Sequence, residues 1–177
     1  SVTAMIRIGN QKGLNDYVTL RKVAISIFLL AIVIEIVFAL LFVALHTTLP
    51  YIFVDINDVT NLTENLEVIA ISANLLLVAA VFQISDGLQV VVLGALRGLQ
   101  DAKIPMYITF VAYWVIGFPI SIYLGLETEL KAVGVWIGLL AGLTAAAIFL
   151  YIRFNYLTKK LVQVQTNPEA SGQVQLQ

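Results

Sequence analysis

The stretch VAISIFLLAIVIEIVFALLFVAL, at residues 23–45, decides the fold of this chain. It carries a single charged residue, Glu35. A bilayer core about 30 Å thick needs roughly 20 apolar residues in a helix that rises about 1.5 Å per residue. Three more runs of this kind follow, and we therefore expect four membrane spans, near residues 23–46, 68–96, 104–126 and 132–152.

Helix is the expected conformation of all four spans. Continuous apolar sequence lacks the alternation of a barrel strand, and an unpaired strand cannot satisfy its backbone in lipid. We expect residues 1–13 to be the end of a truncated transmembrane helix and residues 14–160 to hold the four spans. The Gln-rich residues 161–177 are expected to form a disordered cytoplasmic tail. The predicted fold class is an all-α polytopic membrane protein.

The composition excludes several classes of function. Of the 177 residues, 60% are hydrophobic and 12% are charged, and the mean hydropathy is +0.93. The chain has no cysteine and one histidine, His46, which leaves no thiolate or His-rich chemistry to propose. Because we find neither a phosphate-binding glycine loop nor a nucleophile with its base, we expect no enzyme and no resident cofactor. The net charge of −1 gives no support for nucleic-acid binding.

The charged residues predict the orientation of the spans. Of the ten lysines and arginines, all except Lys131 precede the first span, separate the second span from the third, or follow the fourth. The two alternate loops are rich in Asp and Glu. Because Lys and Arg are retained on the cytoplasmic side during insertion, we expect both chain ends to be cytoplasmic.

Glycine and proline positions predict how the helices end, bend and pack. Gly98 follows a basic residue where a C-terminal glycine is expected, and Pro119 should kink the third span. Gly134, Gly138 and Gly142 fall four apart on the fourth span. Small residues at this spacing let two helices approach closely, so we interpret the row as a packing surface.

Asp86 is the first candidate for chemistry, because it lies inside the second span. A carboxylate there costs roughly 2.5 to 3.5 kcal/mol on insertion scales, so it normally faces a partner or a water-filled cavity on an ion or proton path. Gln83, Asp86 and Gln89 recur every third residue and predict one inclined polar stripe. The alternative is a protonated aspartate that is hydrogen-bonded to an adjacent helix.

Glu35 is also a carboxylate inside a span, but its surroundings differ from those of Asp86. Its neighbours in sequence are apolar and offer no polar stripe at helical spacing. A proton-accepting site and a protonated structural contact both stay open for Glu35. His46, at the end of that span, is expected to be an interface residue.

Five motifs carry a resemblance to a known family: RIGN at residues 7–10, DGLQVV at 86–91, GALRG at 94–98, YWVIGFP at 113–119 and GVWIGL at 134–139, together with Asp101 and Pro105. They resemble the C-terminal lobe of the multidrug and toxic compound extrusion family, the NorM-type exporters. The resemblance implies a twelve-helix transporter with two lobes in a bacterial inner membrane. This chain would supply the end of the eighth helix and the ninth to twelfth helices, and its partner would be the N-terminal lobe.

The resemblance also implies a mechanism. Members of the family exchange Na⁺ or H⁺ for organic cations or other drugs by alternating access. In NorM-like members the aspartate that matches Asp86 belongs to the cation-binding region, which makes Asp86 a possible Na⁺ ligand. Phe82 stands where the family often has a tyrosine, so this chain lacks a hydroxyl ligand there.

Two other functions compete with the exporter. A lipid-linked sugar flippase of the same superfamily would be expected to show a more cationic cavity. A small four-span scaffold protein would use Gly134, Gly138 and Gly142 as an oligomer face and Asp86 as a buried contact.

Overall fold

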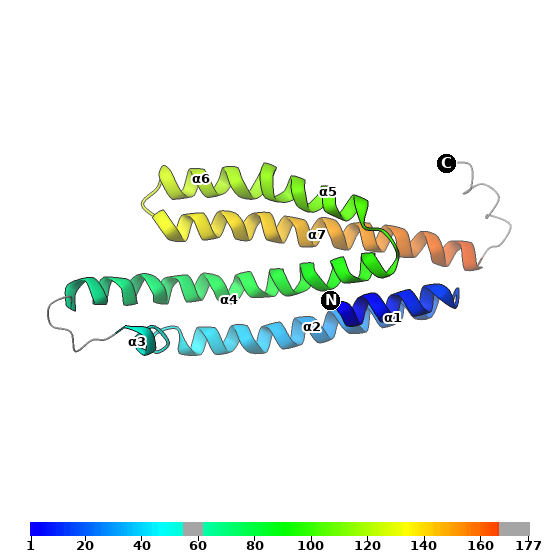
Figure 1. Cartoon of the computed structure of the whole chain (residues 1–177), viewed down its shortest axis with the longest axis horizontal. Coiled ribbons are helices and arrows are strands. Elements are labelled where there is room, and N and C mark those ends of the chain that lie inside the picture. The colour runs from blue at the N-terminus through cyan, green and yellow to red at the C-terminus, as the bar shows by residue number, and fades with distance from the viewer. Residues whose placement is uncertain (55–61, 167–177) are drawn as a thin grey trace.

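The computed structural model describes residues 1–54 and 62–166, and every regular element in this part of the chain is a helix. In chain order they are α1 (Val2–Gly13), α2 (Tyr17–Leu45), α3 (Pro50–Phe53), α4 (Leu62–Gly98), α5 (Lys103–Val111), the π-helix η2 (Ala112–Gly117), α6 (Phe118–Leu126) and α7 (Lys131–Thr166) (Figure 1). Four segments are long and apolar enough to cross a membrane: Tyr17–Leu45, Thr63–Gly98, Lys103–Leu126 and Lys131–Thr166. The predicted all-α polytopic fold is confirmed.

Three helices, α2, α4 and α7, extend beyond the predicted spans. α2 begins at Tyr17 because the Asp16 carboxylate caps it and accepts a hydrogen bond from the Thr19 backbone N–H at 3.0 Å. Hydrogen bonds from the side chain and then the backbone of Thr19 hold the pKa of Asp16 below its ordinary value. α7 continues to Thr166, so the disorder predicted from residue 161 is wrong over residues 161–166. Residues 167–177 lie outside the described residues.

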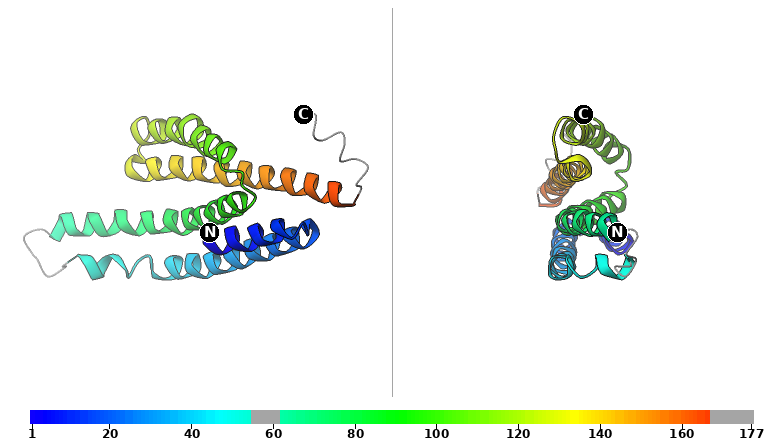
Figure 2. Two further views of the ribbon diagram at one scale, coloured as in Figure 1. Left: turned by 45° about the vertical axis from the view of Figure 1, so that its right-hand side comes forward. Right: turned by 90° about the vertical axis from the view of Figure 1, so that its left-hand side faces the viewer.

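The spanning helices stand side by side in an open, curved row. α4 packs between α2 and α7, and α7 packs between α4 and the span formed by α5, η2 and α6. α1 lies against both α2 and α4. The end-on view of Figure 2 shows α2 and α6 at opposite ends of this row. Because the row does not close into a ring, the described helices leave part of the α4 surface uncovered.

The third span is interrupted as Pro119 predicts. The π-helix η2 occupies Ala112–Gly117, and Pro119 lies in the first turn of α6, which follows directly. A proline lacks the N–H that would continue the regular ladder one turn back, and a π-helical turn is a common response. The span consequently bends between α5 and α6 (Figure 2, left).

Gly98 has a different role from the one its position suggests. The left-handed residue that ends α4 is Gln100, with φ of 62°, so the prediction of a glycine C-cap is wrong. Backbone N–H groups of Gln100 and Asp101 close the helix end by bonding to the carbonyls of Arg97 and Leu96. A Cβ on Gly98 would lie 2.6 Å from the Met5 carbonyl oxygen, so the glycine permits close contact between α1 and α4.

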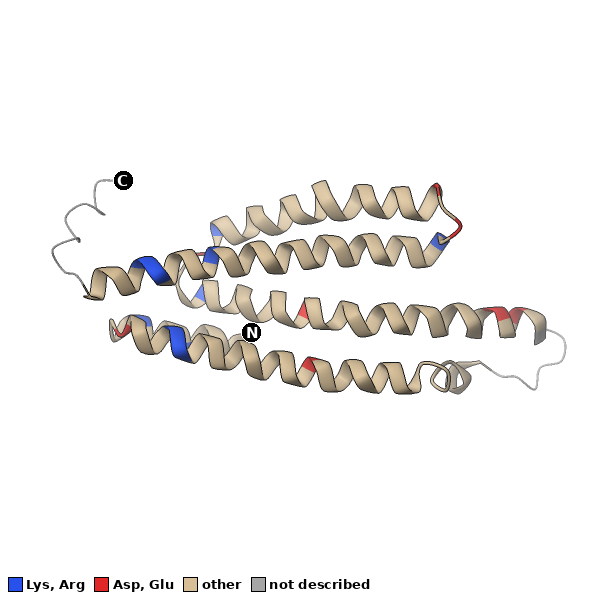
Figure 3. Cartoon of the chain, turned by 180° about the vertical axis from the view of Figure 1, so that it is seen from behind, with Lys and Arg blue, Asp and Glu red and all other residues tan. Residues whose placement is uncertain are grey.

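The two ends of the row differ in charge and packing. Lys and Arg gather where α1 meets α2, where α4 meets α5 and along the last part of α7, which we call the basic end (Figure 3). Asp and Glu gather at the opposite, acidic end, by the start of α4 and the α6–α7 turn (Figure 3). The buried hydrophobic cluster lies toward the basic end, where α1, α2, α4 and α7 meet; it comprises Ile8, Leu20, Ala24, Phe28, Val92, Ala95, Leu96, Leu99, Leu150 and Phe154.

Candidate functional site

Asp86 lies on the uncovered surface of α4, within the membrane-spanning part of that helix. Its side chain is exposed, and the described residues provide no hydrogen-bond or ion-pair partner for its carboxylate. An exposed, unpartnered carboxylate in a span is costly in lipid. The structure therefore does not show the hydrogen bond to an adjacent helix that the structural interpretation of Asp86 requires.

The two glutamines of the predicted stripe bond to helices on either side of Asp86. The Gln83 amide donates to the backbone carbonyl of Glu35 on α2 at 3.3 Å. Gln89 is buried and accepts a hydrogen bond from the Tyr113 hydroxyl of η2 at 2.9 Å. Successive stripe residues are offset by about 60° around the helix. The three side chains of the stripe therefore point in different directions around α4. Asp86 lies between two glutamines that are hydrogen-bonded to other helices.

Glu35 lies beside the residue that follows Asp86. A Cβ on Gly87 would come within 2.4 Å of a Glu35 carboxylate oxygen, so the Glu35 side chain fills the space that this glycine leaves. The structure thus places the Glu35 side chain of α2 against α4, beside the residue that follows Asp86 in the chain. Figure 3 shows acidic positions midway along both helices, far from the charged ends.

The contact of the Glu35 side chain with α4 at Gly87 is the feature that sequence reasoning missed. Apolar neighbours in sequence gave Glu35 no polar surroundings, because its polar neighbours come from another helix. The signal available was Gly87 itself, a glycine next to an acid in a span, which marks close approach of another group.

Other polar and aromatic contacts fix α4 against α7. The Ser85 and Thr144 hydroxyls are 3.0 Å apart. The Phe82 ring meets the Trp136 ring edge to face, with centroids 5.5 Å apart and an interplanar angle of 76°. Phe82 therefore packs on α7, and a hydroxyl at this position would extend from a ring that Trp136 holds in place.

The described residues form no cluster of three or more His, Cys, Asp or Glu side chains that could hold a metal ion. Asp86 and Glu35 offer carboxylate oxygens, which suit a hard cation such as Na⁺. The described residues show no contact between these two carboxylates, and each alone supplies only part of a coordination shell.

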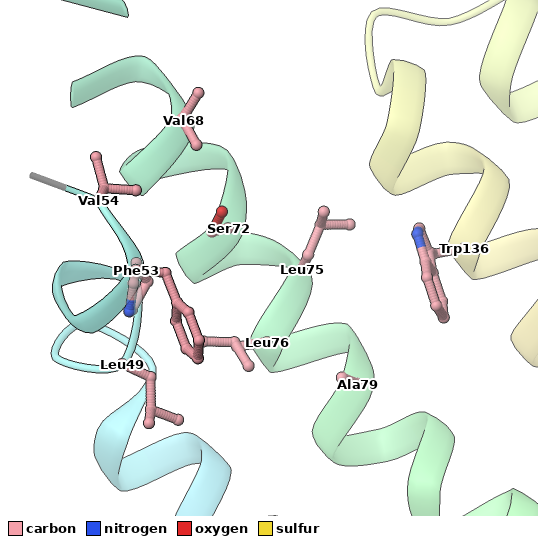
Figure 4. A pocket seen from close by; sticks show the side chains of 10 residues that line it. Leu49, Phe53, Val54, Val68, Ser72, Leu75, Leu76, Ala79 and Trp136 are labelled. Atoms are coloured by element: carbon pink, nitrogen blue, oxygen red, sulfur yellow. The ribbon is translucent and has the colours of Figure 1, made fainter. Parts of the chain in front are cut away.

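An apolar cavity of about 480 Å³ opens between α3, α4 and α7 toward the acidic end (Figure 4). Phe53 of α3 and Leu76 of α4 project toward each other, and Trp136 of α7 lies across from Leu75 of α4. The size and lining suit the apolar part of a small molecule. Ala79, which also lines the cavity, is about 10 Å along the helix axis from Asp86.

The glycine row on α7 is covered by the chain's own backbone. A Cβ on Gly134 or Gly138 would lie 2.3 Å from a backbone atom of Leu124 or Ser121 in α6. On Gly142 it would lie 2.8 Å from the Gly117 Cα in η2. The row is consequently occupied within one chain, whereas the scaffold interpretation needs it as an oligomer face.

His46 caps the far end of α2. Its Nδ1 lies 2.7 Å from the Val43 carbonyl oxygen of the same helix. This contact is local and brings His46 no acid from another helix.

These features define a class of protein: a polytopic helical membrane protein with an exposed acid within one span that has no partner among the described residues, an arrangement typical of ion or proton pathways. Comparison with known proteins makes the class more specific. The family described as MatE matches residues 1–123. The chain belongs to this family, which confirms the resemblance carried by its motifs.

Curated relatives agree with the family. A protein named "Probable multidrug resistance protein NorM" from Rhodopseudomonas palustris is 38% identical over 159 residues, covering 90% of this chain and 32% of the relative. Proteins of the same name from Deinococcus radiodurans and Agrobacterium fabrum are 38% and 35% identical, covering 87% and 90% of this chain and 33% and 34% of the relatives. The chain spans about a third of the length of the curated relatives it matches.

Proposed function

We propose that this chain forms part of the C-terminal lobe of a multidrug antiporter, which exchanges Na⁺ or H⁺ for organic cations or other drugs by alternating access. The observation that carries the proposal is the Asp86 carboxylate, which lies within a span, exposed and without a partner among the described residues. The complete transporter would contain a second lobe across from the uncovered surface of α4. The drug resistance named for the relatives supports the same function.

Competition between the coupling ion and a cationic drug for Asp86 would couple ion entry to drug export. A cation or proton bound at the carboxylate neutralises the charge that a cationic drug also needs. Whichever ligand binds displaces the other, and the lobes reorient only when the charge is covered. Glu35, beside Gly87, supplies a second carboxylate for the same exchange.

The apolar cavity would hold the hydrophobic part of the drug. It opens between α3, α4 and α7, and its Trp136 ring provides a flat surface on which an aromatic or cationic group can stack. Ala79 in the cavity lining is about 10 Å along α4 from Asp86, which is within the length of an extended drug. One drug molecule can therefore contact the cavity and Asp86 together.

In the proposed topology the basic end faces the cytoplasm of a bacterial cell and the acidic end faces outward. The connection between α1 and α2 and the end of α7 then lie on the cytoplasmic side of the inner membrane. The separation of Lys and Arg from Asp and Glu in Figure 3 supports this orientation, because positive residues are retained inside during insertion.

Asp86→Asn in the complete transporter tests the function. The substitution keeps the shape of the side chain and removes its charge, so ion-driven drug efflux from proteoliposomes should fall at least about tenfold while the protein remains inserted. Glu67→Gln is the matched control, because Glu67 is an exposed acid near the start of the same helix. It should transport like the parent protein.

Two outcomes would contradict the role of Asp86. If Asp86→Asn exports drug as fast as the parent, the coupling acid is Glu35 or lies in the second lobe. Glu35→Gln then separates these possibilities. If Glu67→Gln loses as much transport as Asp86→Asn, the loss reflects the charge of α4 as a whole and not the intramembrane site.

A further inference from the structure

The basic end contains a cavity whose lining combines free cations with apolar side chains. It measures about 410 Å³ and lies between α1 and α2. Arg7 of α1 and Lys22 of α2 supply its charges, and Val23, Ile27 and Leu30 of α2 supply most of its apolar lining. We propose that this cavity binds an anionic phospholipid.

The two cations in this cavity are available to a ligand. The described chain contains no hydrogen-bond or ion-pair partner for the side chains of Arg7 and Lys22. Some other basic residues at this end are engaged: Lys12 donates to the Leu99 carbonyl at 2.8 Å, and Arg153 pairs with Asp101 at 2.9 Å. Among the described residues Arg97 and Lys103 are free as well, but they do not line the cavity.

No acid lines the cavity between α1 and α2. Asp16 is the acid that feels the charge of Lys22, but its carboxylate is used to cap α2 through Thr19. A neighbouring cavity at the same end contains Asp101, which is bonded to Arg153, and so carries its own counter-charge. The cavity at Arg7 and Lys22 therefore has an unbalanced positive charge that complements a phosphate.

The polar and apolar parts of the lining are ordered along the bilayer normal. α2 runs from the basic end toward the middle of the membrane, so Lys22 lies near the headgroups and Leu30 lies deeper. Eight residues of helix cover about 12 Å, which is close to the hydrocarbon depth of one leaflet, about 15 Å. A headgroup phosphate at Arg7 and Lys22 thus places an acyl chain along Val23, Ile27 and Leu30.

This chemistry distinguishes a phospholipid from a free anion. Inorganic phosphate would use the two cations and leave the apolar wall exposed. A neutral phospholipid would use the wall but gain less from the cations, since each basic residue near the headgroups favours an anionic lipid by about fivefold. The proposal depends on the membrane placement of α1 and α2 and not on Asp86, so binding can be measured without transport.

The test is lipid binding to the complete transporter in neutral detergent, followed by native mass spectrometry with phosphatidylglycerol and phosphatidylcholine. The variant R7Q/K22Q should weaken the tightest phosphatidylglycerol binding by about thirtyfold, because two basic residues are lost. R97Q/K103Q is the matched control, since Arg97 and Lys103 are exposed at the same end and do not line the cavity. It should change that affinity less than twofold.

Three results would overturn the proposal. They are unchanged phosphatidylglycerol affinity in R7Q/K22Q, equal losses in R7Q/K22Q and R97Q/K103Q, or displacement of the bound lipid by millimolar inorganic phosphate. The charge-conserving variant R7K/K22R is the control for misfolding. It should bind phosphatidylglycerol with an affinity within about threefold of that of the parent. If it loses binding as fully as R7Q/K22Q, the positive charges do not hold the lipid and the proposal fails.

Discussion

α2 and α7 both pack against α4, yet the share of residues that is buried differs greatly between the two helices. In its most apolar stretch α7 has 39% of its residues buried within the chain, whereas α2 has 11%. α2 is nevertheless the more apolar helix. Its Leu29, Val33 and Phe38 side chains are all more than half exposed.

The difference teaches that the hydropathy of a spanning helix and its packing against other helices are separate properties. Lipid tails are as apolar as leucine, so a strongly apolar helix gains little by packing on another helix. α7 packs through Gly134, Gly138 and Gly142, where backbones approach too closely for a side chain to fit between them. Hydropathy therefore identifies the spans, and small residues identify which spans touch.

The largest effect should come from Gly138→Leu on α7. A Cβ there would lie 2.3 Å from the Ser121 backbone nitrogen, and backbone cannot move aside as a flexible side chain can. We expect the amount of inserted transporter, measured by quantitative blotting of membranes, to fall several-fold. Gly13→Leu is the control, because a Cβ on Gly13 would meet no atom within 4 Å. Parental abundance of Gly138→Leu with selective loss of transport would instead put Gly138 on the substrate path.

A smaller effect is expected from the paired truncations Phe154→Ala on α7 and Phe38→Ala on α2. Phe154 is 1% exposed and packs edge to face on Phe28, with ring centroids 5.2 Å apart. Its removal should leave a cavity and lower the free energy of unfolding by about 3 kcal/mol. Phe38 is 52% exposed, so its truncation should cost less than about 1 kcal/mol. Thermal unfolding in detergent measures both, and equal losses would remove the contrast between the helices.

The smallest effect should follow from Arg153→Gln, which breaks the ion pair between α7 and Asp101. The 2.9 Å contact has side chains that are 24% and 15% exposed, so solvent still screens it. We expect a stability loss of about 1 kcal/mol that shrinks at high salt. Arg97→Gln, which removes an exposed cation without an ion-pair partner among the described residues, should change stability less. A loss that does not depend on salt would assign the role of Arg153 to its apolar stem.

The amino-acid sequence predicts the number of spans, their helical state and the bend at Pro119, because each depends on properties of consecutive residues. A long apolar run must be helical in lipid, and a proline must interrupt the helix that contains it. The motifs around Asp86 are also local, and they were enough to indicate the family.

Helix ends were harder to predict, because competing local signals are close in energy. Gly98 looks like the end of α4, but the close approach of Met5 requires a glycine within the helix, and Gln100 takes the left-handed position instead. Residues 161–166 look polar and disordered, yet they continue α7 as far as Thr166. One contact from this extension reaches α2, where the Tyr17 N–H donates to the Gln165 side chain at 2.9 Å.

For the candidate site, the sequence by itself determined that Asp86 and Glu35 lie inside spans, since each interrupts an apolar run. Only the tertiary structure decided that Glu35 meets α4 at the residue after Asp86, because the Glu35 carboxylate fits the gap left by Gly87 on that helix. It also decided that Gln83 and Gln89 bond to different helices and leave Asp86 between them. Helical periodicity fixes the direction of a side chain relative to its own axis, whereas the group it meets depends on how helices distant in sequence pack together.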